Sequence, residues 1–146
     1  MNLKPANRLD VLKMDRVVAI MCGVRAGTGL WSSLLDHHPN TVGTPDCMLL
    51  GFYEFWDEHG HLPISELITT FIDYYGIIFD ANAGIKCPRI SLKQLGEALN
   101  FIGLGPEQDE SLQVDREAFK SSITEIIGED AQVSRKLFFQ AAHAAY

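Results

Sequence analysis

Hydrophobic residues recur at helical spacing through most of the chain beyond residue 46, and this pattern predicts a mainly helical protein there. The clearest apolar stripe runs through residues 65–78, where Ser65 is expected to cap the helix. Its predicted inward positions are Leu67, Ile68, Phe71, Ile72, Tyr75 and Ile78. The residues from Asp80 to Gly84 then predict a turn.

Further segments show the helical period in the second half of the chain. Ser91 and Gln94 form a capping box before a stripe that ends at Ile102, and residues 103–110 are expected to form an acidic loop. Asp115 caps the next helix and Gly128 stops it, with predicted inward residues Phe119, Ile123, Ile126 and Ile127. The last helix is expected to begin between Asp130 and Ser134, with a stripe of Val133, Leu137, Phe138, Ala141 and Ala145.

The pattern differs nearer the N-terminus, where residues 17–21 form a continuous apolar and partly β-branched run. Such a run is typical of a strand buried on both faces of a parallel sheet. A glycine-rich turn follows, with Gly23, Gly27 and Gly29, and a helix is predicted from Leu30 onward. Backbone N–H groups and the positive end of the helix dipole then point at one place, beside Arg25. The stretch therefore predicts a site for a phosphate or sulfate group.

Two common phosphate-binding patterns do not fit this turn. The pattern G-x-x-x-x-G-K-[ST] needs a lysine after its last glycine, but Gly27 is followed by Thr28 and Gly29 by Leu30. The dinucleotide pattern G-x-G-x-x-G needs a different glycine spacing. Instead, V-R-A-G-T-G-L at 24–30, followed by L-L-D-H-H-P at 34–39, resembles the 5′-phosphosulfate loop of sulfotransferases. The usual form of that loop is close to P-R-S-G-T-T-L, with L-L-D-x-H-P behind it.

This resemblance implies a transferase that takes 3′-phosphoadenosine 5′-phosphosulfate as donor and moves its sulfuryl group to an acceptor hydroxyl or amine. By position, the donor-binding residues are Arg25, Ala26, Gly27, Thr28, Gly29 and Leu30. Val24, Ala26 and Gly29 replace the family's proline, serine and second hydroxyl residue, so backbone amides are expected to hold the donor. The acceptor is an unidentified small molecule, glycan or peptide, and no metal is expected.

Catalytic roles are predicted for two residues outside the loop. Asp46 lies where tyrosylprotein sulfotransferases carry a glutamate, a few residues after the H-P pair, and is a candidate base for the acceptor proton. Its alternative role is to cap the next helix. Lys86, in I-K-C-P, resembles the lysine of the family's K-[ST]-P element, which implies that it neutralises charge on the leaving oxygen. The alternative is an exposed lysine before a proline turn.

The apolar segment from Cys47 to Trp56 predicts a buried or interface helix, and the part from Met48 to Trp56 offers a surface for an oligomer. Glu54 in this segment is a second candidate base, or a carboxylate on the exposed edge of the helix. Residues 57–61, D-E-H-G-H, contain metal-ligand types. They lack the histidine spacing of H-E-x-x-H, so a solvated corner is predicted instead.

Together these patterns predict an α/β fold, with a phosphate-loop-like strand, turn and helix at the start and mostly helices after it. The neighbouring strands of a parallel sheet are missing, so the sheet is expected to be incomplete. Residues 1–146 are expected to form one domain, the N-terminal part of a longer sulfotransferase-like enzyme, with residues 1–14 as a loose lead-in. Two alternatives stay open: an atypical phosphate-loop kinase, and a non-catalytic helical interaction module with a vestigial anion-binding loop.

Composition narrows the choice of partners. The net charge of −7 argues against binding to nucleic acid, although one small anion needs only a local cation. The three cysteines, Cys22, Cys47 and Cys87, are far apart and favour a reducing cytoplasm over a disulfide framework. No apolar run is long enough to cross a bilayer, and no signal peptide is evident, so no membrane span is expected.

Overall fold

The computed structural model describes residue 11 and residues 51–83, 102–104, 106–128 and 132–146. These ranges contain the helices α3 (Phe52–His59), α4 (Ile64–Tyr74), α6 (Arg116–Ile127) and α7 (Arg135–Ala145). They also contain the 3₁₀ helix η1 (Gly76–Ile78) and the strands β1 (Ile102–Leu104) and β2 (Glu110–Ser111). The described chain is therefore rich in helix, as the hydrophobic period predicts.

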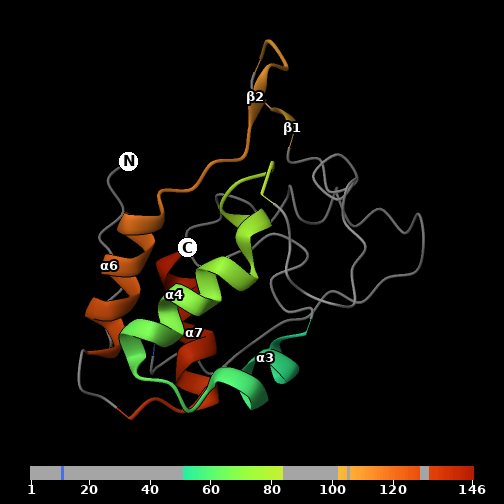
Figure 1. Ribbon diagram of the computed structural model, residues 1–146. Coiled ribbons are helices and arrows are strands. Elements are labelled where there is room, and N and C mark those ends of the chain that lie inside the picture. Colours follow the sequence, from blue (N-terminus) through green and yellow to red (C-terminus); the bar gives the residue numbers. More distant parts are fainter. Residues whose placement is uncertain (1–10, 12–50, 84–101, 105, 129–131) are drawn as a thin grey trace, which may run out of the picture.

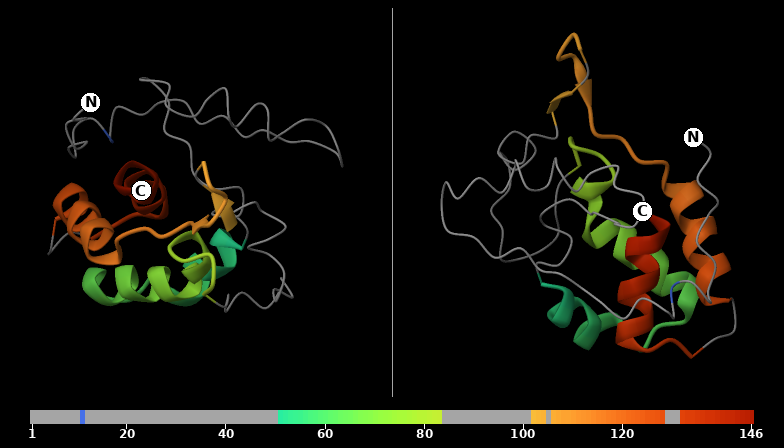
Figure 2. Two further views of the ribbon diagram at one scale, coloured as in Figure 1. Left: turned by 90° about the horizontal axis from the view of Figure 1, so that it is seen from above. Right: turned by 180° about the vertical axis from the view of Figure 1, so that it is seen from behind.

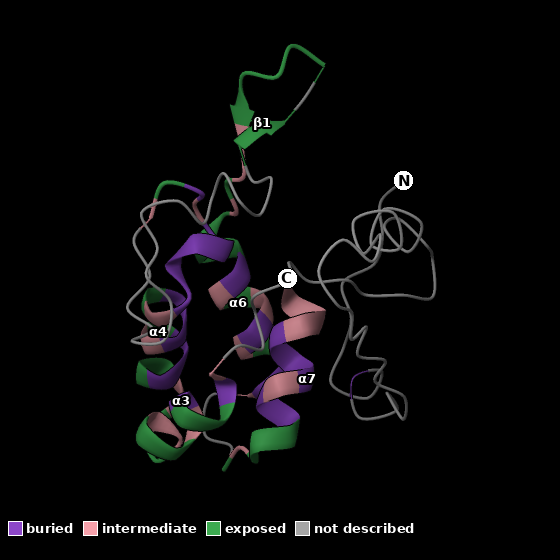
Figure 3. Ribbon diagram, turned by 90° about the vertical axis from the view of Figure 1, so that its right-hand side faces the viewer, coloured by how far each residue is buried: buried purple, intermediate pink, exposed green. Residues whose placement is uncertain are grey.

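Helices α4, α6 and α7 lie around one core (Figure 1). Helix α6 packs against both α4 and α7, and α3 packs against α4. Helix α3 lies at one end of this helical body, and the hairpin of β1 and β2 leaves from the other end (Figure 1). Seen from above, α4, α6 and α7 form three sides of the core (Figure 2). Their buried residues face one another across it, while the hairpin is exposed (Figure 3).

Aromatic side chains fill much of the core. Phe71 of α4 is 1% exposed, and its ring centroid lies 5.6 Å from that of Phe55, 5.4 Å from Phe138 and 6.1 Å from Phe119. One side chain thus joins α3, α4, α6 and α7. Full burial of such a side chain is worth about 1.5–3 kcal/mol, and each good aromatic pair adds roughly 0.5–1.5 kcal/mol. All six predicted inward residues of the segment 65–78 are buried, which confirms that stripe.

The predicted end signals of α6 are confirmed. The Asp115 carboxylate accepts hydrogen bonds from the backbone N–H groups of Glu117 and Ala118, at 2.9 and 3.0 Å. Gly128 closes the helix with a φ of 87°, which glycine adopts without a Cβ penalty. The four predicted inward residues of this helix are also buried. Ser134 caps α7, at the late edge of the predicted start, by accepting a hydrogen bond from the Leu137 N–H.

The predicted cap and length of the first long helix are wrong. Helix α4 begins at Ile64 after Pro63, and Ser65 lies inside it, where its carbonyl accepts a hydrogen bond from Thr69 Oγ1. Proline has no N–H to leave unpaired and its fixed φ suits a helix start, so the chain turns helical earlier. The α-helix stops at Tyr74, and the chain tightens into η1 at Gly76.

The predicted acidic loop contains a β-hairpin, and Ile102 is not part of a buried helical stripe. Ile102 pairs with Ser111 and Leu104 with Glu110 in an antiparallel register that contains an irregularity. Ile102 is 44% exposed. Behind the hairpin, the Ala81 N–H donates to the Leu112 carbonyl and the Val114 N–H to the Phe79 carbonyl. These backbone hydrogen bonds join residues 112–114, which follow β2, to residues 79–81 beyond η1, and the spacing of hydrophobic residues does not predict such pairing.

Several predictions fall outside the described residues: the strand at 17–21, the helix from Leu30 and the part of the helix at 91–101. The described sheet is antiparallel and uses other residues, so it does not bear on a parallel sheet. Val11, from the predicted loose lead-in, is fully buried in the core cluster. Within the described ranges, every helix is too short or too polar to cross a lipid bilayer.

Candidate functional site

The predicted donor loop and its catalytic partners lie outside the described residues. This holds for all eight predicted positions: Arg25, Ala26, Gly27, Thr28, Gly29, Leu30, Asp46 and Lys86. The structure therefore does not test their predicted roles, which stay predictions. The described chain supplies the other candidate groups, which lie on the surface of the helical body.

Glu54, the second candidate base, lies in the first turn of α3 and is exposed. Its neighbours Phe52 and Phe55 point into the chain's own core, whereas Tyr53 is 64% exposed. The apolar character of α3 is therefore used largely for internal packing. Of the segment from Met48 to Trp56, residues 48–50 lie outside the described ranges, and its role in an oligomer stays a prediction.

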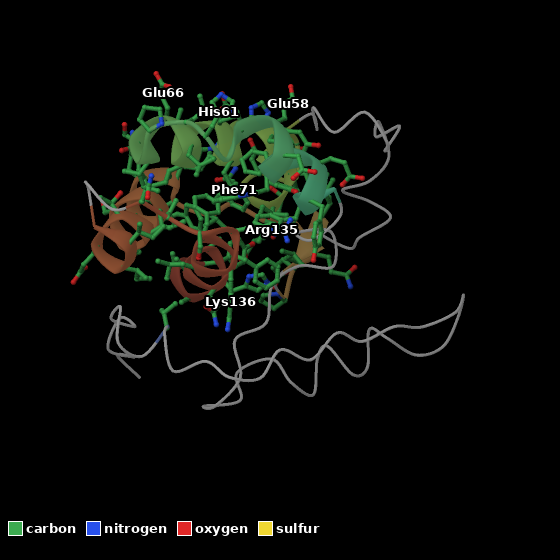
Figure 4. The ribbon with its side chains drawn as sticks, turned by 90° about the horizontal axis from the view of Figure 1, so that it is seen from below. Glu58, His61, Glu66, Phe71, Arg135 and Lys136 are labelled. Atoms are coloured by element: carbon green, nitrogen blue, oxygen red, sulfur yellow. The ribbon has the colours of Figure 1, made fainter. Side chains whose placement is uncertain are left out.

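Residues 57–61, which span the end of α3 and the turn that follows it, form a solvated corner, as predicted. Asp57, Glu58 and His61 are exposed, and Glu58 and His61 point away from the core (Figure 4). The His59 ring instead packs 5.1 Å from the Phe55 ring, with Nε2 at 3.9 Å from a Glu58 oxygen. In the part of the chain that the structure describes, no three His, Cys, Asp or Glu side chains gather in a metal-like group.

Two cationic side chains, Arg135 and Lys136, lie at the start of α7, near α3. The Arg135 guanidinium carbon lies 4.3 Å from the centroid of the Tyr53 ring, a cation–π contact worth about 0.5–1 kcal/mol at an exposed site. Lys136 follows on the helix and points away from α3 (Figure 4). The sequence does not reveal this pair, because Tyr53 and Arg135 meet only through the packing of the helical body.

Two shallow hollows open directly to solvent. One lies along α4 and α6 and is lined by Ser65, Glu66, Thr69, Thr70 and Lys120. The other lies at the start of α6 and is lined by Phe79, Asp80, Gln113, Val114, Asp115, Arg116 and Glu117. The Asp115 carboxylate already accepts hydrogen bonds from two backbone N–H groups at that helix end. Both hollows are too open to enclose a ligand, so neither is proposed as an active site.

His143 is a partly buried titratable side chain that the sequence analysis does not single out. Its ring centroid lies 4.3 Å from that of Phe139, with the two ring planes tilted by 39°, and Nδ1 lies 2.8 Å from the Phe139 carbonyl oxygen. This contact assigns the N–H to Nδ1, because a carbonyl oxygen only accepts. Burial lowers the pKa of His143, and the backbone hydrogen bond opposes that change in part. The neutral imidazole is thus favoured in the folded protein.

Comparison with known proteins adds no relative. No protein-family model, curated protein or solved structure matches the chain.

Proposed function

We propose that this protein binds 3′-phosphoadenosine 5′-phosphosulfate and transfers its sulfuryl group to an acceptor hydroxyl or amine. One observation carries the proposal: the sequence from Val24 to Leu30, with the L-L-D-H-H-P segment behind it, keeps the cation, the glycine and one hydroxyl position, Thr28, of a sulfotransferase loop. The helical body that follows in the chain is compatible with this assignment. This sequence lacks the lysine that the nucleoside-triphosphatase pattern requires after its last glycine.

In the proposed reaction each group has one task. Arg25 and the backbone amides of the loop hold the 5′-phosphosulfate, which carries the negative charge. Asp46 accepts the proton of the acceptor as the new S–O bond forms. The S–O bond to the 5′-phosphate breaks, and Lys86 neutralises the charge on the leaving oxygen. The products are the sulfated acceptor and 3′-phosphoadenosine 5′-phosphate.

The first prediction concerns donor binding. Thermal shift and calorimetry with 3′-phosphoadenosine 5′-phosphate should show stabilisation, because a ligand that binds the folded state raises its unfolding free energy. Arg25→Ala should weaken this binding by roughly 10–100-fold, since a hydrogen bond to a charged group is worth about 1.5–3 kcal/mol. Arg116→Ala, an exposed arginine at the start of α6, is the matched control and should bind like the unchanged chain.

The outcomes separate the alternatives. Stabilisation by ATP with magnesium, and not by the adenosine bisphosphate, would support the kinase alternative and overturn the proposal. No stabilisation by either ligand would favour the interaction module. With binding established, turnover of the donor with hydroxyl acceptors should fall more for Asp46→Asn than for Glu54→Gln. The reverse order would assign the base to Glu54.

A further inference from the structure

We draw no further inference here: the strongest candidate, the surface patch that Tyr53, Arg135 and Lys136 form at the start of α7, is a helix N-terminus beside one exposed aromatic ring, and nothing in the part of the chain that the structure describes shows what would cover it.

Discussion

The imidazole of His143 lies on α7 with its Nδ1–H directed at the Phe139 carbonyl oxygen, 2.8 Å away. Burial lowers its pKa below the ordinary 6.5. Around and below that pH the unfolded chain binds a proton more readily than the folded chain does. The unfolding free energy therefore decreases as the pH is lowered. The loss begins near pH 6.5 and ends below the lowered pKa of the folded state.

His143→Gln should therefore flatten the pH dependence of the unfolding free energy as the pH is lowered through 6.5, because it removes the titrating group. Urea unfolding at a series of pH values measures this slope. His61→Gln, an exposed histidine in the corner between α3 and α4, is the control and should keep the slope of the unchanged chain. A slope in His143→Gln equal to that of the control would contradict the assignment.

Single residues also show where the sequence is informative. Phe71 and Phe138 can be assigned to the core from their helical spacing, and both are buried. The contact between Arg135 and Tyr53 cannot be predicted in this way, because no period links residues on two helices. The donor-loop residues from Arg25 to Leu30 are predicted from a local pattern alone.

At the scale of elements, the start of a helix depends on side chains that lie next to it in the sequence. The Asp115 carboxylate bonds two N–H groups at the start of α6. Asp115→Ala should lower the unfolding free energy by about 0.5–2 kcal/mol, because those donors lose their acceptor. Thermal and urea unfolding measure the loss. Asp109→Ala, in the exposed hairpin turn, removes the same charge without a helix cap, so an equal loss there would show that the cap does not matter.

Elements that depend on strand pairing are predicted less well than the helices. The helical stripe assigned to residues 91–102 runs into β1, where Ile102 faces solvent. The pairing of Ile102 with Ser111 joins residues across a turn that has Gln108 at a φ of 56°. Neither strand is long enough to show a period of its own, so the pattern of hydrophobic residues carries no sign of the hairpin.

Across the whole molecule, the end of α7 is tied to the segment that follows α4. The Tyr146 hydroxyl donates a hydrogen bond to the Ile78 carbonyl at 2.8 Å, and its ring lies 6.2 Å from that of Phe79. Helix α7 also packs on α6. The hydrogen bond between Tyr146 and Ile78 thus connects two parts of the helical body that are far apart in the chain.

Tyr146→Phe keeps the ring and removes only the hydroxyl. It should lower the unfolding free energy by about 0.5–1.5 kcal/mol, the net worth of one intramolecular hydrogen bond. Tyr53→Phe removes an exposed hydroxyl and keeps the ring under Arg135, so its stability should stay close to that of the unchanged chain. Equal urea midpoints for the two variants would refute a stabilising role for the Tyr146 hydroxyl.

By itself the sequence determined the features that depend on near neighbours along the chain. These are the buried apolar stripe within residues 65–78, the cap Asp115, the stop at Gly128, and the pattern of residues from which donor binding is proposed. Only the tertiary structure decided which helices pack together, that Tyr53 meets Arg135, that Tyr146 reaches Ile78 and that Ile102 joins a hairpin. Periodicity and capping act within a few residues, whereas these contacts depend on the path of the chain through space.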